Sequence, residues 1–261
     1  MITSLGLTHS KIKKYVGRVI DMKIVTWNAN GRFVKNFTVI LKEDSDMKDA
    51  DIYVIQECTN PSISDCEDYA DLGPEYEWVG WIGDEIYQDY GLGIIAKKET
   101  VEMKVWDLDD KGLRYFIPVT VNDDFNLLAV WTRIDKGESN AKYPKLITNY
   151  YEEHKGSGFF NEDMIICGDF NCDKRAKYKK HGENVDEMID KLSEISLIDV
   201  YHDIEGEEEG KESIPTHIWT HKKPFHVDHV FAAKGKVKCL QIGDADEWLE
   251  YSDHMPIVFK I

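Results

Sequence analysis

The sequence has no long hydrophobic run and few basic residues. No apolar stretch approaches the roughly 18 residues that a membrane-spanning helix needs, so no membrane span is predicted. Lys and Arg number 32 against 49 Asp and Glu, which gives a formal net charge of −17. A protein that coats nucleic acid needs a basic face to displace phosphate counterions, so this class is disfavoured. A nuclease is not excluded, because a bound divalent cation reverses the potential at an acidic site.

Cysteine is sparse and shows no metal-binding or disulfide pattern. The five cysteines are odd in number and have no CxxC spacing: Cys58, Cys66, Cys167, Cys172 and Cys239. Neither a disulfide framework nor a cysteine zinc site is indicated. Reduced thiols are typical of the cytoplasm, so we expect a cytoplasmic protein whose cysteines are structural.

The length of 261 residues suits one large α/β domain. A hydrophobic fraction of 42% and seven tryptophans indicate a packed globular chain. The first strong strand pattern, "MKIVTWN", opens at Met22, so we expect the domain to span residues 22–261. Residues 1–21 are interpreted as an extension or a start codon assigned too early. Their basic residues follow the small apolar patch, which is the reverse of a secretory signal.

Short apolar strands alternate with a few helical segments along the chain. Several strands are apolar at consecutive positions, as expected when both faces of a sheet are covered. The predicted strands are Lys23–Asn28, Asp51–Gln56, Trp78–Ile82, Gly91–Lys97, Val101–Leu108, Arg114–Val121, Asn126–Thr132, Met164–Cys167, His217–Trp219, His226–Ala233, Val237–Ile242 and Pro256–Ile261. The predicted helices are Val34–Lys42, Tyr143–Lys155 and Asn184–Ile195, the last with Asn184 as a candidate cap. This pattern favours an α/β sandwich of mixed sheets.

Acids, amides and a histidine recur next to these strands. They are Asn28 with Asn30, Glu57, Asp169 with Asn171, Asp228, and Asp253 with His254. Taken singly, an Asn after a strand is often a turn former, and an Asp–His pair often makes only a local hydrogen bond. Independent turns need not select carboxylate, amide and imidazole each time. The recurrence therefore favours one catalytic site at the carboxyl ends of the strands.

The motifs "WNANG", "IQE", "GDFN", "VDH" and "SDH", in this order, resemble the signature of the endonuclease/exonuclease/phosphatase superfamily, which has the DNase I-like fold. The resemblance runs from about Met22 to Ile261. It implies a four-layer α/β sandwich, with two mixed sheets packed face to face and helices outside. It also implies divalent-metal-dependent hydrolysis of a phosphoester.

Hard oxygen ligands select Mg²⁺ or Mn²⁺, which keep several waters and need only one or two carboxylates. Glu57 is the expected anchor, with Asn28 and Asn30 nearby, and Asp253 would reach a metal directly or through water. The ion would polarise the phosphate and steady the leaving oxygen. Schemes with one metal and with two metals both stay open.

The remaining motif residues are assigned catalytic roles. Asp169 would position and deprotonate the attacking water. The amide of Asn171 would hold a phosphate oxygen or the nucleophile. His254 would donate to the phosphate, with its imidazole oriented by Asp228.

Alternation along 225–233 places Asp228 on the same face as His226 and opposite His229. His229 is therefore interpreted as a core or supporting residue. His217 and His221, which flank "IWT", are weaker candidates for substrate contact. The acidic segment Glu205–Glu212, "EGEEEGKE", is interpreted as a solvated loop.

Two positions depart from the family pattern. Trp131 stands where many members carry a Tyr or His, and an indole cannot shuttle a proton. Arg133 or Tyr143 would then contact the phosphate. Asn30 stands where some relatives have an acid, which would weaken a metal ligand.

Three functions are compatible with the motifs. The leading hypothesis is a nuclease that cleaves DNA or RNA, by endo or exo action. The alternative is a phosphatase or phosphodiesterase acting on a small phosphorylated metabolite or lipid headgroup, which the net charge favours. The third is a non-catalytic binding protein on the same fold, which would not require the full set of polar residues. A monomer is expected.

Overall fold

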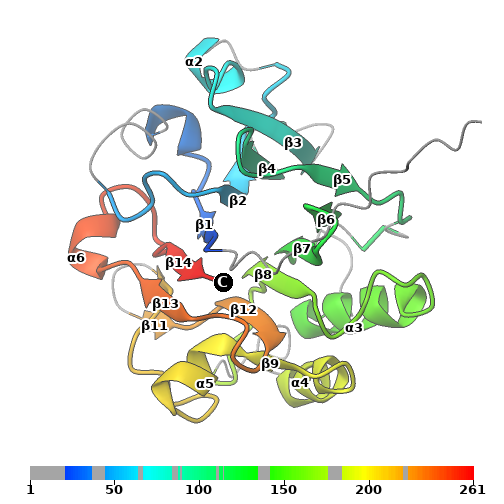
Figure 1. The fold of residues 1–261 in the computed structure, drawn as a ribbon. Helices are drawn as coiled ribbons and strands as arrows, with labels where there is room; N and C mark the ends of the chain where they lie inside the picture. The colour runs from blue at the N-terminus through cyan, green and yellow to red at the C-terminus, as the bar shows by residue number, and fades with distance from the viewer. Residues whose placement is uncertain are drawn as a thin grey trace, which may run out of the picture.

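The computed structural model describes residues 21–36, 45–63, 67–83, 88, 90–109, 112–113, 115–134, 142–175, 184–219 and 223–261. Within these residues, two six-stranded mixed sheets pack face to face, with helices on their outer sides (Figure 1). The predicted α/β sandwich is confirmed. Residues 1–20, which make up nearly all of the expected extension, lie outside the described part.

The first sheet carries both ends of the described chain. Its strands, in spatial order, are β13 (Cys239–Ile242), β14 (Ile257–Lys260), β1 (Lys23–Asn28), β2 (Ile52–Cys58), β4 (Gly91–Lys97) and β3 (Tyr76–Gly83). The neighbours β1 and β2 are parallel and the other pairs are antiparallel. The carboxyl ends of β1 and β2 therefore meet at one edge.

The second sheet has one parallel pair at its centre. Its order is β5 (Met103–Val105), β6 (Phe116–Val121), β7 (Phe125–Trp131), β8 (Ile165–Asp169), β12 (Asp228–Ala233) and β9 (Leu197–Asp199). The parallel pair is β7 and β8, and the long connection between them contains α3 (Tyr143–His154). A separate two-stranded hairpin is formed by β10 (His217–Trp219) and β11 (Lys223–Phe225).

The main core lies between the two sheets. On β1, Ile24 points into this core, whereas Val25 and Trp27 pack in a separate cluster on the outer side. On the second sheet, Leu127 faces the same inner core and Leu128 packs under the helices. The alternation follows from the two-residue period of a strand.

Helices cover the outer faces. The helices α3 and α4 (Val185–Ser193) lie against the outer face of the second sheet, through residues such as Tyr150 and Met188. The remaining helices are short: α2 (Glu67–Ala70), α5 (Val200–Glu205) and α6 (Ala245–Trp248). Trp248 of α6 packs on Trp27 at the outer side of the first sheet.

The longer elements agree with the sequence prediction, β10 was predicted with its observed bounds, and several other short elements were missed. The predicted helices at 143–155 and 184–195 are confirmed as α3 and α4 with small changes at their ends. Asn184 occupies the N-cap of α4, but its side chain donates to Glu187 and does not cap the helix. Of the predicted helix at 34–42, residues 37–42 lie outside the described part. The three-residue β9 and β11 are too short to show a period.

No helix within the described residues is both long enough and apolar enough to cross a membrane.

Candidate active site

Strand alternation brings three of the predicted residues to one rim of the inner core. Asn28 follows Ile24 and Thr26 on the inner face of β1, and Asp169 follows Ile165 and Cys167 on the inner face of β8. Asp228 stands directly opposite Asp169 in the antiparallel β8–β12 pair. Asn28 Nδ2 donates to Asp169 Oδ2 at 2.9 Å, which joins the two sheets at this rim.

Glu57 reaches the rim through an irregularity in β2. Regular alternation would place Glu57 on the opposite face from Gln56, whose amide lies inside and contacts Thr26. The register against β4 shifts between Gln56 and Cys58, and Glu57 has a φ of 53°. Such a bulge re-aims a side chain. Asn28 Nδ2 lies 3.3 Å from Glu57 Oε1, and burial raises the pKa of the Glu57 carboxyl despite the opposing charge of His254.

Asp169 is buried and accepts several hydrogen bonds. Its Oδ1 accepts from the backbone N–H of Asn171 at 2.7 Å, and its Oδ2 accepts from Asn171 Nδ2 and Asn28 Nδ2, each at 2.9 Å. Burial and the charge of Asp228 raise the pKa of Asp169 to about 7, against the opposing charge of His254. A carboxyl with a pKa near neutrality suits a general base.

The "GDFN" turn holds Asp169 and Asn171 in place. Gly168 has a φ of 147°, and a Cβ at this position would overlap the Val130 carbonyl of β7. Asn171 has a φ of 49°, a conformation that Asn tolerates better than most residues. Its Nδ2 also donates to the Thr132 carbonyl at 2.9 Å. These turn residues therefore also place a carboxylate and an amide at the rim.

His254 and Asp228 form a buried imidazole–carboxylate pair. The distance from His254 Nδ1 to Asp228 Oδ2 is 2.9 Å. Burial alone lowers the pKa of His254. The charges of Asp228, Asp169 and Asp253 oppose this effect, with Asp228 the largest contributor, and raise the pKa to about 10. The ring is therefore an imidazolium at neutral pH. Both nitrogens of an imidazolium donate, so Nε2 has a proton to offer beyond the pair.

The backbone around His254 is tied to β1. Ser252 Oγ donates to the Asn28 carbonyl at 2.7 Å and accepts from the His254 N–H at 3.0 Å. Trp27 Nε1 donates to the His254 carbonyl at 3.0 Å. On the other side of the pair, Thr216 Oγ1 accepts from the Asp228 N–H at 3.0 Å. The position of the imidazole is thus set by three separate segments of the chain.

His217 is a site residue that was only a weak candidate from sequence. Its ring stacks on His254 with centroids 4.3 Å apart, and its Nε2 lies 3.6 Å from Asp253 Oδ2. Burial works to raise the pKa of Asp253, but the contact with His217 and the charge of His254 leave it below its usual value. An isolated antiparallel β-bridge between residues 217 and 254 brings the two rings together. No local sequence pattern predicts this bridge.

A pocket of about 480 Å³ opens beside these groups. It is lined by Glu57, Tyr90, Trp131, Thr132, Arg133, Ile134, Tyr143 and Asn171. Both predicted substrate contacts, Arg133 and Tyr143, are among them. Trp131 is only 3% exposed and stacks on Tyr115, with the Arg133 guanidinium 5.4 Å from the centre of its ring. The Trp131 indole therefore has a packing role, which is consistent with its inability to shuttle a proton.

The donor set fits a hard divalent cation. Carboxylates of Glu57, Asp169, Asp228 and Asp253 gather at the rim, and their charges act on one another. Asp228 Oδ1 is buried and has no hydrogen-bond partner among the described residues. Oxygen-rich sites of this kind suit Mg²⁺ or Mn²⁺.

Two further predicted ligands, Asn28 and Asn30, lie at the end of β1 and in the turn that follows it. The side chain of Asn28 directs its N–H groups to carboxylates, and its Oδ1 accepts the Asn30 N–H at 2.9 Å. Asn28 thus supports the acids in this arrangement. Asn30 has a φ of 49° in the turn after β1.

His229 lies on the opposite face from Asp228, as predicted. It is buried, and its Nδ1 lies 2.7 Å from Asp199 Oδ2. The structure thus places His229 in the interior, as the sequence predicted, with Asp199 as its partner. His226 lies before the first residue of β12, although it was predicted to be part of this strand. His221 is outside the described residues.

The fold and the polar rim together define a DNase I-like phosphoesterase. The family model described as "Endonuclease/Exonuclease/phosphatase family" matches residues 25–254. The chain belongs to this family, whose members hydrolyse phosphoesters. Among curated proteins, no sequence match reaches significance.

Solved structures show the same fold. A 3′-5′ exonuclease (NExo) from Neisseria meningitidis has a TM-score of 0.66 and 17% identity, covering 91% of this chain and 98% of its own. An AP endonuclease from Archaeoglobus fulgidus has a TM-score of 0.67 and 22% identity, with the same coverage. A substituted form of the 3′ phosphatase NExo from Neisseria, bound to a product DNA hairpin, has a TM-score of 0.66 and 16% identity, again over 91% and 98%.

Proposed function

We propose that the protein is a divalent-metal-dependent phosphoesterase that cleaves nucleic-acid phosphodiesters. The main support for this proposal is one observation: Asn28, Glu57, Asp169 and the Asp228–His254 pair lie together at one rim beside the pocket. These groups come from both sheets, and their charges act on one another.

The chain's own groups divide the work. Asp169, whose pKa is raised to about 7, would accept the proton of the attacking water. Asn171 and Asn28 hold the Asp169 carboxylate by hydrogen bonds. The His254 imidazolium, held by Asp228, would donate to a phosphate oxygen as negative charge develops. Arg133 and Tyr143 line the pocket, where they would contact the substrate phosphate.

Glu57 would anchor an Mg²⁺ or Mn²⁺ ion, with Asp253 and Asn30 as further ligands directly or through water. When bound, such an ion polarises the phosphate and stabilises the leaving oxygen. The same ion would offset the four clustered carboxylates, which lets an acidic protein receive an anionic substrate.

Phosphatase action on a small phosphorylated metabolite or lipid headgroup is the second candidate. The net charge of −17 weakens long-range attraction to a nucleic-acid strand. The NExo structure, solved with a DNA hairpin, supports DNA as the first substrate to test. We also propose that the protein works as a monomer in the cytoplasm, where its free cysteines Cys58, Cys167, Cys172 and Cys239 would stay reduced.

A substrate panel with and without chelator tests the proposal. DNA, RNA, a generic phosphodiester and small phosphomonoesters are incubated with Mg²⁺ or Mn²⁺, and then with EDTA. We expect hydrolysis that EDTA and Asp169→Ala each abolish. Asp124→Ala, an exposed acid in the β6–β7 turn, is the matched control and should keep full activity. No turnover of any phosphoester with either metal would refute the proposal.

A salt titration separates the two substrate classes. Oligonucleotide binding should weaken steeply as ionic strength rises, because phosphate contacts release counterions. Turnover confined to small phosphomonoesters, without measurable oligonucleotide binding at low salt, would favour the phosphatase.

A further inference from the structure

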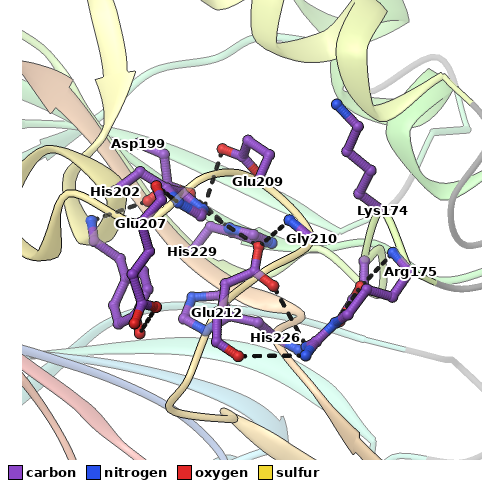
Figure 2. Close-up of polar contacts among 12 residues, drawn as sticks. Lys174, Arg175, Asp199, His202, Glu207, Glu209, Gly210, Glu212, His226 and His229 are labelled. Atoms are coloured by element: carbon purple, nitrogen blue, oxygen red, sulfur yellow. Dashed lines mark hydrogen bonds and ion pairs between the residues drawn. The ribbon is translucent and has the colours of Figure 1, made fainter.

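A second polar cluster lies on the outer side of β12, away from the catalytic rim. Figure 2 shows its members: Asp199 at the end of β9, His202 on α5, and Glu209 and Glu212 in the segment that follows. We call these four residues the outer cluster. Ligand atoms of Asp199, His202 and Glu209 all lie within 4.8 Å of one another. His229 connects the cluster to β12, but Asp228 beside it points to the opposite face.

His202 presents one nitrogen to the acids of the outer cluster. Its Nδ1 lies 2.8 Å from the Glu207 carbonyl oxygen, which can only accept, so Nδ1 carries a proton. Its Nε2 lies 3.2 Å from Glu209 Oε1 and 3.4 Å from Glu212 Oε1, and it makes no hydrogen bond of good geometry within the described residues. A histidine that donates one N–H to a carbonyl while the other nitrogen faces acids has the arrangement typical of a metal ligand.

Glu212 supplies an independent indication of a ligand. Its side chain is only 3% exposed, and its carboxylate points toward His202 (Figure 2). Oε1 accepts the Gly210 N–H at 2.6 Å. Among the described residues, Oε2 accepts no hydrogen bond and has the Arg175 guanidinium at 3.5 Å. A buried carboxylate costs free energy unless its oxygens are well satisfied. The segment interpreted from sequence as a solvated loop therefore turns one acid fully inward.

Asp199 is oriented by its neighbours in the way that a metal ligand is oriented. Its Oδ1 accepts the Tyr201 N–H at 2.9 Å and its Oδ2 lies 2.7 Å from His229 Nδ1. His229 Nε2 lies 3.3 Å from the Cys172 carbonyl, so both of its ring nitrogens donate and the ring is charged. The ionisable groups around the cluster include Lys174, Arg175 and His229 as cations, Asp173, Glu207 and the three cluster acids as anions, and the His226 ring.

We propose that the outer cluster binds a divalent transition-metal cation, of the Zn²⁺ or Mn²⁺ class, at a site separate from the catalytic rim. One imidazole nitrogen with carboxylate oxygens is a donor set that these ions accept, whereas Mg²⁺ and Ca²⁺ prefer oxygen alone. The ion would bind His202 Nε2 with oxygens of Glu209, Glu212 and Asp199.

The bound ion would fasten the 206–214 segment to the second sheet. This segment leads into Thr216, whose Oγ1 holds the backbone of Asp228. His226 Nδ1 lies 2.9 Å from the Ile214 carbonyl and adds a second tie to the same stretch. The cation would therefore have a structural role that supports the catalytic strand without taking part in the reaction.

A proton competes with the metal cation for His202 Nε2. Burial alone lowers its pKa, but the carboxylates of Glu209 and Asp199 raise the pKa of His202 to about 9. An imidazolium would neutralise the same acids, and a cation must displace this proton in order to bind. Metal binding and protonation therefore predict different behaviour in a direct titration.

Zn²⁺ and Mn²⁺ titrations of the full chain in a Glu57→Gln background test the proposal. This substitution weakens the catalytic site by removing its proposed anchor, and the added outer-cluster substitutions identify which part of the remaining binding belongs to the outer cluster. The protein is stripped with EDTA, dialysed, and titrated with ZnCl₂ or MnCl₂ by calorimetry. Glu209→Gln and His202→Gln are each added to this background, with folding checked by circular dichroism.

We expect one equivalent of Zn²⁺ or Mn²⁺ to bind Glu57→Gln, with the affinity falling by about tenfold or more when Glu209→Gln or His202→Gln is added. Glu208→Gln is the matched control: Glu208 carries the same charge one residue away, is 75% exposed, and pairs with Lys211, so binding should not change. Absence of Zn²⁺ and Mn²⁺ binding in Glu57→Gln would overturn the proposal. So would binding that Glu209→Gln, His202→Gln and Glu208→Gln leave equally intact, or weaken equally.

Discussion

Replacing Asp228 by Asn tests the central charge pair of the site. The change keeps the shape of the side chain, and its Oδ1 could still accept from His254 Nδ1, which lies 2.9 Å from Asp228 Oδ2 in the wild type. It removes the largest of the charges that raise the pKa of His254 from an ordinary 6.5 to about 10, whereas Asp169 and Asp253 remain. That difference is about 3.5 pH units, or ~5 kcal/mol at roughly 1.36 kcal/mol per unit. Burial lowers the pKa, so the loss of Asp228 should move the titration of His254 toward neutral pH.

The Asp228→Asn substitution should change both the acid limb and the alkaline limb of the pH profile of kcat/KM. In the wild type we expect activity to rise as Asp169 deprotonates near pH 7 and to fall as His254 deprotonates near pH 10. In Asp228→Asn the alkaline limb moves to lower pH by about two units or more. The acid limb should also change, because the charge of Asp228 raises the pKa of Asp169, the charge of His254 lowers it, and the variant alters both.

Stability gives a second measurement with a defined sign. Because the pKa of His254 is raised in the folded protein, its contribution to the free energy of unfolding is fully present below pH 6.5. This contribution is lost as the pH rises through about 10. Asp228→Asn should therefore flatten the dependence of unfolding free energy on pH between these values.

Imidazole NMR provides the direct test of Asp228→Asn. The titration of His254 should move to lower pH, whereas that of His229, held by Asp199, serves as the internal reference and should not change. An alkaline limb and a His254 titration that both stay near pH 10 in Asp228→Asn would refute this reasoning.

Three further substitutions address the support of the site. Asn28→Ala removes a donor to Asp169, so the acid limb of kcat/KM should move to higher pH; an unchanged limb would contradict this role. Gly168→Ala should lower the free energy of unfolding in urea by more than about 1 kcal/mol, because a Cβ there overlaps the backbone of β7. Gly156→Ala, where a Cβ meets open space, is its control. Asn30→Asp adds a carboxylate, and Asp tolerates the left-handed backbone conformation at this position. The Mg²⁺ concentration for half-maximal activity should therefore fall by roughly threefold to tenfold. A rise in this concentration would exclude Asn30 from the cation site.

Local sequence determined which residues stand at the ends of the inner strands. The polar residues beside the apolar strand patterns predict that Asn28, Asp169 and Asp228 lie near one another, and the structure places them at one rim. The two-residue period of a strand correctly separates His229 from Asp228. The longer helices were also predictable, since α3 and α4 each bury a stripe of residues with helical spacing.

Tertiary structure alone decided how these residues meet. The bulge that turns Glu57 inward arises in the pairing of β2 with β4, and the stacking of His217 on His254 arises between segments 37 residues apart. The inward turn of Glu212 likewise depends on α5 and Arg175. A strand's period depends on neighbouring residues and can be read from sequence. Contacts between distant segments depend on how whole sheets pack, and no short stretch of sequence encodes that packing.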